Sequence, residues 1–292
     1  YLSDIQFESP EAKEFANRAL ETISYYSITA SMKLAKEKGA YETFPGSKWD
    51  RGIMPIDTID ILSQERGIKI DLDTSTTLDW ESLKQNIKKH GLRNSNTMAI
   101  APTATIANIS GVTQSIEPTY KNLYVKSNVN GDFIVVNEFL VTDLKKINLW
   151  NQDIIDEIKF HDGSIKNIET IPQELRDKYK EVFDIDYKAI VDLAAERGKW
   201  IDQSQSLNLY FIGTSGKILS EMYTYAWDKG LKTTYYLRSL GATQVEKSTV
   251  STAKFGTTHT RKQNEDVAIP NLPIPEEPAL CKVEDPTCES CQ

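Results

Sequence analysis

Residues 97–118 read TMAIAPTATIANISGVTQSIEP, and this stretch gives the first indication of the fold. Residues 97–101 form a short apolar run that stops at Pro102, as a buried strand does before a turn. Residues 103–108 then have the composition of a helix start. A strand followed directly by a helix is the repeating unit of α/β architectures, so we expect this fold class.

The turn between this strand and helix also has the chemistry of an anion site. Backbone N–H groups at a helix start lack intrahelical partners, and the hydroxyls of Thr103 and Thr105 add further donors. Such groups suit a phosphate or diphosphate. The alternative is that Thr103 only caps the helix, and the segment by itself favours this simpler interpretation.

Further helix and strand signals lie on both sides of this stretch. Ser9, Pro10 and Glu11 form an N-cap, a first-turn proline and a first-turn acid, and Gly39 ends the same apolar pattern. The helix at 216–229 carries one apolar face. We expect the other helices at 79–90, 138–146, 172–183 and 187–197, strands at 132–136 (after a turn at Asn130) and 231–237, and an irregular loop at 41–70.

Composition excludes several classes of function. The 292 residues carry a net charge of -8 and a pI near 5.1, which argues against nucleic-acid binding and against an anionic membrane surface. No apolar run approaches the roughly 18 residues of a membrane span, and the first residues are acidic. We therefore expect a cytoplasmic protein that binds neither nucleic acid nor membrane.

All three cysteines lie near the end of the sequence, at Cys281, Cys288 and Cys291. A Cys-x-x-Cys pair without a second pair or a nearby histidine is a poor zinc site, so we expect no metal. Two close thiols are suited to dithiol–disulfide exchange. Residues 251–292 are polar and rich in proline, which predicts a flexible tail with an r.m.s. reach of roughly 35 Å after a folded part at 1–250.

Several ordered motifs together resemble the large subunit of class I ribonucleoside-diphosphate reductases. They are GLRNS at 91–95, IAPTATIANISGVTQSIEP at 100–118, YKNLY at 120–124, ERG at 196–198, IDQSQS at 201–206 and LKTTYYLRS at 231–239. The resemblance runs from about residue 5 to residue 250. It implies the C-terminal portion of the family's ten-stranded α/β barrel, with a flexible C-terminal tail.

The resemblance also implies site residues. In this family the turn after the strand holds the substrate diphosphate, which places that role on Thr103, Ala104, Thr105 and Ile106. Adjacent tyrosines pass a radical to the active site, which places the relay on Tyr235 and Tyr236. By themselves two neighbouring tyrosines in a strand usually serve packing, although a phenol can be oxidised reversibly if its proton leaves with the electron.

The tail has a matching role in the family, because a closed radical site excludes thioredoxin. The resemblance implies that Cys288 and Cys291 carry reducing equivalents inward from thioredoxin or glutaredoxin. Cys281 receives no role. No cofactor is expected on this chain, because the radical-generating metal centre belongs to a small (beta) subunit, expected to dock near the helix at 216–229.

The family's three reacting cysteines and its Asn-x-Cys-x-Glu loop are not in this sequence, since no cysteine precedes Cys281. We therefore expect reduction of ribonucleoside diphosphates only together with an N-terminal portion of the large subunit. A split gene, an intein-separated part and a truncated fragment remain open.

Two other hypotheses stay open. One is a fragment of an adenosylcobalamin-dependent class II reductase, which the tyrosine pair disfavours. The other is a non-catalytic remnant that binds a partner and is regulated through its dithiol.

Overall fold

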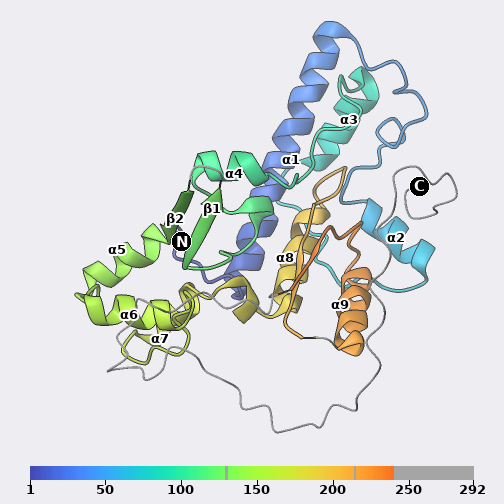
Figure 1. Cartoon of the computed structure of the whole chain (residues 1–292). Helices are drawn as coiled ribbons and strands as arrows, with labels where there is room; N and C mark the ends of the chain where they lie inside the picture. Colours follow the sequence, from blue (N-terminus) through green and yellow to red (C-terminus); the bar gives the residue numbers. More distant parts are fainter. Residues whose placement is uncertain (129–130, 214, 240–292) are drawn as a thin grey trace, which may run out of the picture.

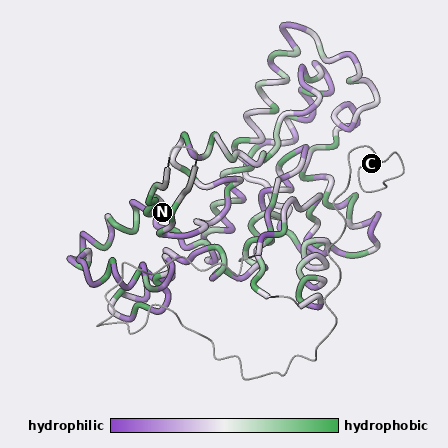
Figure 2. Tube along the Cα trace, in the orientation of Figure 1, coloured by the Kyte–Doolittle hydropathy of each residue, from purple (hydrophilic) through white to green (hydrophobic). Residues whose placement is uncertain are grey.

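The computed structural model describes residues 1–128, 131–213 and 215–239 (Figure 1). Their buried apolar residues form three large cores and a small one of Ala12, Ala16 and Leu193. Helices and short strands alternate along this part of the chain, in agreement with the expected α/β class. Both polar and apolar residues occur along most helices, as expected of helices with one buried face (Figure 2).

The first core lies along the long helix α1 (Pro10–Lys38). The hydroxyl of Ser9 accepts from the amide of Ala12 at 3.2 Å, and Gly39 ends the helix at a φ of 80°. Helices α3 (Trp80–His90) and α8 (Tyr187–Gly198) both pack against α1 (Figure 1). Leu20, Ile28, Met32, Trp80, Ile87 and Trp200 are among the residues buried there.

The second core joins α8 to α9 (Gly216–Asp228) and to the strand β3 (Leu209–Phe211). Strand β3 pairs in parallel with β4 (Leu237–Ser239), with Leu209 opposite Leu237. Buried residues here include Ile190, Val191, Leu207, Leu209 and Met222.

The third core holds helices α5 (Glu138–Lys146) and α6 (Gln152–Phe160), with α7 (Gln173–Lys178) packed beside them. Strands β1 (Leu123–Asn128) and β2 (Gly131–Val136) form an antiparallel hairpin that precedes them. A 3₁₀ turn, η2 (Val182–Asp184), leads into α8. Short elements elsewhere are α2 (Thr58–Arg66), α4 (Ala104–Ser110) and η1 (Gln114–Ile116). None of the helices in the described ranges is long and apolar enough to span a membrane.

Several expected elements are confirmed. Helices α1, α3, α5, α8 and α9 lie within a residue or two of their predicted ranges, and β2 contains the predicted strand. The turn expected at Asn130 lies outside the described residues, as do the tail 251–292, Cys281 and the pair Cys288 and Cys291.

Four expectations are wrong in detail. The predicted loop 41–70 contains α2, and the predicted helix 172–183 is α7 followed by the separate turn η2. The predicted strand 97–101 makes only a single parallel bridge, between Ile100 and Gln205. In the predicted strand 231–237, only Leu237 belongs to β4. Before it, the amide of Tyr235 donates to the Leu207 carbonyl, but that of Tyr236 donates to the Asn208 side chain and not to a neighbouring backbone.

Candidate functional site

The expected anion turn begins at Thr103, which precedes α4 with an unusual φ and ψ of 12° and 32°. Its side chain makes no capping hydrogen bond to the helix; its hydroxyl oxygen accepts from the amide of Ser115 at 3.1 Å. The capping interpretation is therefore wrong. Ala107 makes the first helical bond, to the Thr103 carbonyl at 2.8 Å, so the amides of residues 104–106 precede the helical ladder.

The chain returns to this turn through a strained segment at Ser115 and Ile116. Their φ values of 51° and 58° are positive, which is rare for any residue except glycine and most of all for a β-branched one. Such a conformation costs on the order of 1–3 kcal/mol per residue and persists only where the surroundings enforce it. The Ser115 hydroxyl lies 3.3 Å from the Ala101 carbonyl and 3.2 Å from the Ser206 hydroxyl, which helps to hold the segment.

Residues 202–206 form the base on which the turn rests. The amide of Ile100 donates to Ser204 at 3.2 Å, and the amide of Ser206 donates back to Ile100 at 2.8 Å. The carboxylate of Asp202 accepts from the amides of Thr97 and Met98 at 2.6 and 2.9 Å. The approach to the turn is thus fixed along its length, although it is not a regular strand.

Three buried polar residues lie close to Ser115 and β3. They are Arg197, Glu117 and Asn208, which are 3%, 7% and 4% exposed. Arg197 donates to the Gln205 side chain at 3.1 Å, and that side chain donates to the Ser115 carbonyl at 3.4 Å. Burial lowers the pKa of Arg197 to about 10, although the negative charge of Glu117 opposes the shift. The guanidinium therefore stays charged at neutral pH.

Glu117 links this group to the strand β3. Its carboxylate accepts from the amide of Asn208 at 2.9 Å, from the Asn208 side chain at 3.2 Å, and from the hydroxyl of Tyr210. Burial, together with the hydrogen bond to Glu117, raises the pKa of the Tyr210 phenol. A buried carboxylate with several donors is the arrangement that offsets the cost of burying its charge.

The tyrosine pair directly precedes β4, the strand that pairs with β3. The ring centroids of Tyr235 and Tyr236 are 4.1 Å apart with planes inclined by 51°, and the two residues are 47% and 52% exposed. The amide of Tyr235 donates to the Leu207 carbonyl at 2.7 Å, and that of Tyr236 to the Asn208 side chain at 3.2 Å. The neighbouring Tyr236 phenol raises the pKa of Tyr235.

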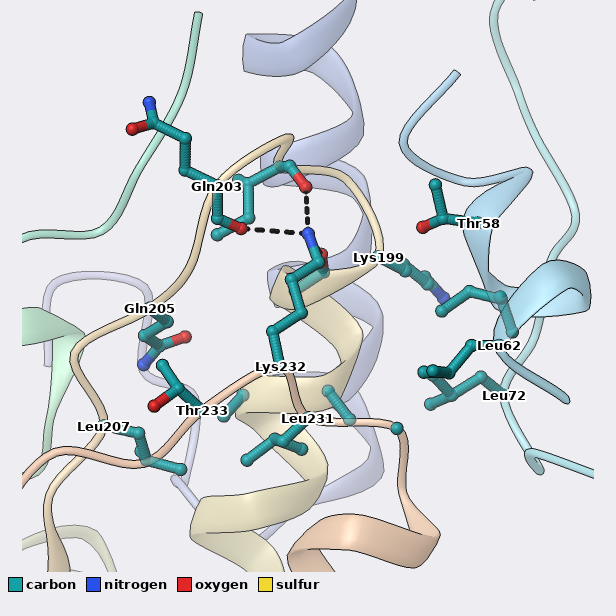
Figure 3. Close-up of a pocket in the computed structure, with 16 residues that line it drawn as sticks. Thr58, Leu62, Leu72, Lys199, Gln203, Gln205, Leu207, Leu231, Lys232 and Thr233 are labelled. Atoms are coloured by element: carbon teal, nitrogen blue, oxygen red, sulfur yellow. Dashed lines mark hydrogen bonds between the residues drawn. The ribbon is translucent and has the colours of Figure 1, made fainter. Parts of the chain in front are cut away.

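Lys232 holds the segment that leads to the tyrosines, and Figure 3 shows its ammonium hydrogen-bonded beside Gln203. Its ammonium donates to the carbonyls of Gly198, Ile201 and Gln203, at 3.3 Å for Gly198 and 2.9 Å for Gln203. Three acceptors match the three donors of an ammonium. Although much of the residue is exposed, burial of the ammonium lowers its pKa to about 8, against the opposing charge of Asp202. The adjoining cavity of about 30 Å³ has room for water and no larger ligand.

The structure brings the sequence-predicted residues into one assembly. Residues 202–208 bond both to Ile100 and Ser115, which flank the turn at 103–106, and to the amides of Tyr235 and Tyr236. Cys288 and Cys291 lie outside the described residues. Sequence analysis missed Glu117, Asn208 and Lys232. The only signal in the sequence was a charged residue, Glu117, beside Ile116 and Pro118 in a stretch otherwise without charge.

The apolar face expected on α9 is only partly free. Met222 and Ala226 are buried in the second core, so most of that face packs within the chain. Ile218 and Trp227 are 41% and 46% exposed, and the guanidinium of Arg66 lies 4.6 Å from the Trp227 ring.

Comparisons with known proteins place the chain in a family. The model of the ribonucleotide reductase barrel domain matches residues 1–237. The ribonucleoside-diphosphate reductase subunit alpha of Chlamydia trachomatis is 49% identical over 294 residues, covering 100% of this chain and 28% of that protein. The large subunit of Plasmodium falciparum is 42% identical over 247 residues, covering 84% of this chain and 29% of that protein.

A solved structure gives the same result. The alpha subunit of the class Id ribonucleotide reductase of Actinobacillus ureae superposes with a TM-score of 0.61 at 26% identity, covering 82% of this chain and 36% of that one. The chain spans less than a third of the length of the curated relatives described above. It belongs to the ribonucleotide reductase large-subunit family, as part of the barrel domain.

Proposed function

We propose that this chain is the part of a class I ribonucleoside-diphosphate reductase large subunit that holds the substrate diphosphate, relays the radical and carries the reducing dithiol. It acts with an N-terminal portion of the large subunit and with a small subunit that holds the radical-generating metal centre. The observation that carries the proposal is the shared support at residues 202–208. Ile100 and Ser115, which flank the anion turn, are hydrogen-bonded to it, and so are the amides of the tyrosine pair.

The diphosphate role rests on free donors at the turn. Ala104, Thr105 and Ile106 are exposed, and their amides precede the first helical hydrogen bond. The Thr103 oxygen accepts from Ser115, which leaves its own O–H available to donate to a phosphate oxygen. Because the chain is acidic overall, attraction for an anionic substrate has to come from such local donors.

The relay role rests on the contact between Tyr235 and Tyr236. One phenol is oxidised as the other is reduced: an electron crosses between rings whose centroids are 4.1 Å apart, and a proton moves between the phenols. The Tyr236 phenol acts on that of Tyr235 strongly enough to raise its pKa, and this closeness gives the proton a path. A phenol of ordinary pKa near 10 needs such a path, because its radical cation is too acidic to persist.

The dithiol role rests on the spacing of Cys288 and Cys291 in the sequence. Replacing both by Ser is expected to stop turnover driven by thioredoxin or glutaredoxin and to leave turnover with a small dithiol largely intact. The reason is that a small dithiol reaches the closed site directly, whereas the protein reductants do not. Steady-state assays with each reductant check this, and equal loss with both would argue against a shuttle.

The whole proposal is tested by conversion of CDP to dCDP. The chain is assayed alone, and then with the separately expressed N-terminal large-subunit polypeptide and the small subunit, under thioredoxin. Activity only in the full mixture supports the class I proposal. Activity that requires added adenosylcobalamin and no small subunit would support the class II alternative, and a well-folded complex without activity would support a redox-regulated binding remnant.

A further inference from the structure

Asn208 occupies a buried position with hydrogen bonds on two sides. On one side its backbone and side-chain N–H groups donate to the Glu117 carboxylate at 2.9 and 3.2 Å. On the other side its side-chain oxygen accepts from the amide of Tyr236 at 3.2 Å. The residue is 4% exposed, so solvent offers no ready substitute for these partners.

Charge fixes the orientation of the Asn208 side chain. An ionised carboxylate only accepts hydrogen bonds, so the NH₂ group of Asn208 has to face Glu117 and its oxygen has to face Tyr236. Arg197, buried in the same group, supplies the compensating positive charge. The carboxylate therefore determines which acceptor the Tyr236 amide meets.

We propose that Asn208, oriented by Glu117, is a positioning residue that fixes the backbone of Tyr236 beside Tyr235. The inference rests on the proposed relay function of Tyr236. The Tyr235 amide is held by the Leu207 carbonyl, a backbone group that is present whatever side chain the residue carries. Of the two tyrosine amides, only that of Tyr236 is held by a side chain. This side chain, Asn208, lies directly before β3 and two residues after Ser206.

An exchange of hydrogen-bonding groups tests the orientation directly. In Asn208→Asp two carboxylates face each other. In Glu117→Gln the Asn208 side chain loses the negatively charged acceptor that fixes its orientation. In the double variant the new amide of position 117 donates to the new carboxylate of position 208, which still accepts from Tyr236. The donors and acceptors between positions 117, 208 and 236 are then restored, with the negative charge moved from position 117 to position 208. The Tyr210 hydroxyl, which donates to Glu117 in the wild type, has to turn and accept from the new amide.

The first readout is hydrogen exchange at the Tyr236 amide, measured by NMR on the full 292-residue chain. Each single variant is expected to exchange this proton at least about tenfold faster than the wild type, and the double variant to recover most of the protection. Unchanged exchange in the single variants, or additive losses in the double variant, would overturn the inference.

A control separates positioning from general loss of stability. Asn122 is another fully buried asparagine, which donates to the Tyr179 carbonyl at 2.8 Å in the third core. Asn122→Asp is expected to lower the thermal midpoint without selectively speeding exchange at Tyr236. Selective exposure of Tyr236 in this variant would also overturn the inference.

The second readout is turnover of CDP by the complete reductase. The single variants are expected to lower kcat at least about tenfold with KM for CDP nearly unchanged, and the double variant to regain turnover. If exchange at Tyr236 follows the predicted pattern while kcat stays constant in every variant, the relay function of Tyr236 fails and the inference falls with it. If exchange does not follow the pattern, the positioning role fails while the relay proposal stands.

Discussion

Glu21 and Glu117 are both buried carboxylates, but they serve different regions of the molecule. Glu21, in α1, accepts from the amide and hydroxyl of Thr77 at 2.7 and 2.6 Å, and from the indole of Trp80 at 3.1 Å. Those donors belong to the start of α3 and the residues just before it. Glu117 accepts from Asn208 and Tyr210, and Asn208 continues to the half-exposed Tyr236.

The difference shows that burial alone does not separate a structural carboxylate from one that serves a site. In both cases several donors offset the cost of burying charge. What differs is where the donors lead: from Glu21 they lead back into the first core, and from Glu117 they lead to the proposed relay. Substitutions in the two regions should therefore affect different properties.

The largest loss of stability is expected for Glu21→Gln. This change removes the negative charge from a buried acceptor and replaces one of its two oxygens by an NH₂ group among donors of Thr77 and Trp80, so we expect it to lower the free energy of unfolding by about 3 kcal/mol. The Tyr236 amide should keep its local protection. Chemical denaturation of the full chain checks the first effect.

Glu14→Gln is the matched control on the same helix. Glu14 is exposed and pairs only with Arg18, so its substitution should change stability by less than about 0.5 kcal/mol. For Glu21, burial acts to raise the pKa, but the hydrogen bonds led by Thr77 lower it below 4.5 overall. Its contribution should therefore be present above about pH 4.5 and be lost as pH falls through the lower, folded-state pKa. A Glu21→Gln difference that stays constant down to pH 3 would contradict this.

Glu181 extends the comparison to a buried carboxylate with fewer donors. It accepts from the amide of Asn122 at 2.7 Å, and burial raises its pKa to about 7. A folded-state pKa above the unfolded value of 4.5 favours the protonated acid, so its stabilising contribution is complete below pH 4.5 and lost as pH rises through 7.

Glu181→Gln should accordingly gain stability relative to the wild type between pH 5 and pH 8. The expected gain is on the order of 2–3 kcal/mol. Denaturation at several pH values measures this difference in stability. A Glu181→Gln variant that is less stable than the wild type over this range would show that the fold favours the ionised carboxylate.

The smallest effect is expected for Lys232→Met. Because the side chain is partly exposed, water can take the place of its ammonium at the carbonyls, and global stability should change by less than about 1 kcal/mol. The three carbonyls that its ammonium holds lose their donor, so exchange at the amides of 233–236 should rise. Lys229→Met, which removes an ammonium only 3.7 Å from Asp71, is the control and should leave these amides unchanged. Unchanged exchange at these amides in Lys232→Met would show that Lys232 does not hold this segment.

Local signals made much of the fold predictable. Ser9, Pro10 and Gly39 mark the ends of α1 as predicted, and Asp79 and Gly91 bound α3. Helix α6 was missed although it has a comparable signal, the side chain of Asn151 accepting from Ile154 at 3.0 Å. Helix α2 has no side-chain cap bond, so its start was hidden in the sequence.

Long-range pairing was the part that the sequence did not reveal. The segment 97–101 has the composition of a strand but forms one bridge, to Gln205, because its other amides meet side chains such as Asp202. The link from Glu117 to Asn208 joins residues 91 positions apart, and no local pattern announces it. The site residues themselves came from the family resemblance, and their hydrogen-bonded support came from the structure.

The most direct test of the central claim is turnover of CDP by the complete reductase that carries Tyr236→Phe. Phenylalanine keeps the ring, but it has no phenolic proton to lose and is much harder to oxidise. We expect this variant to bind CDP and to keep its stability within about 0.5 kcal/mol, yet to form no dCDP. Formation of dCDP at the wild-type rate would show that the pair of tyrosines is packing and not a relay.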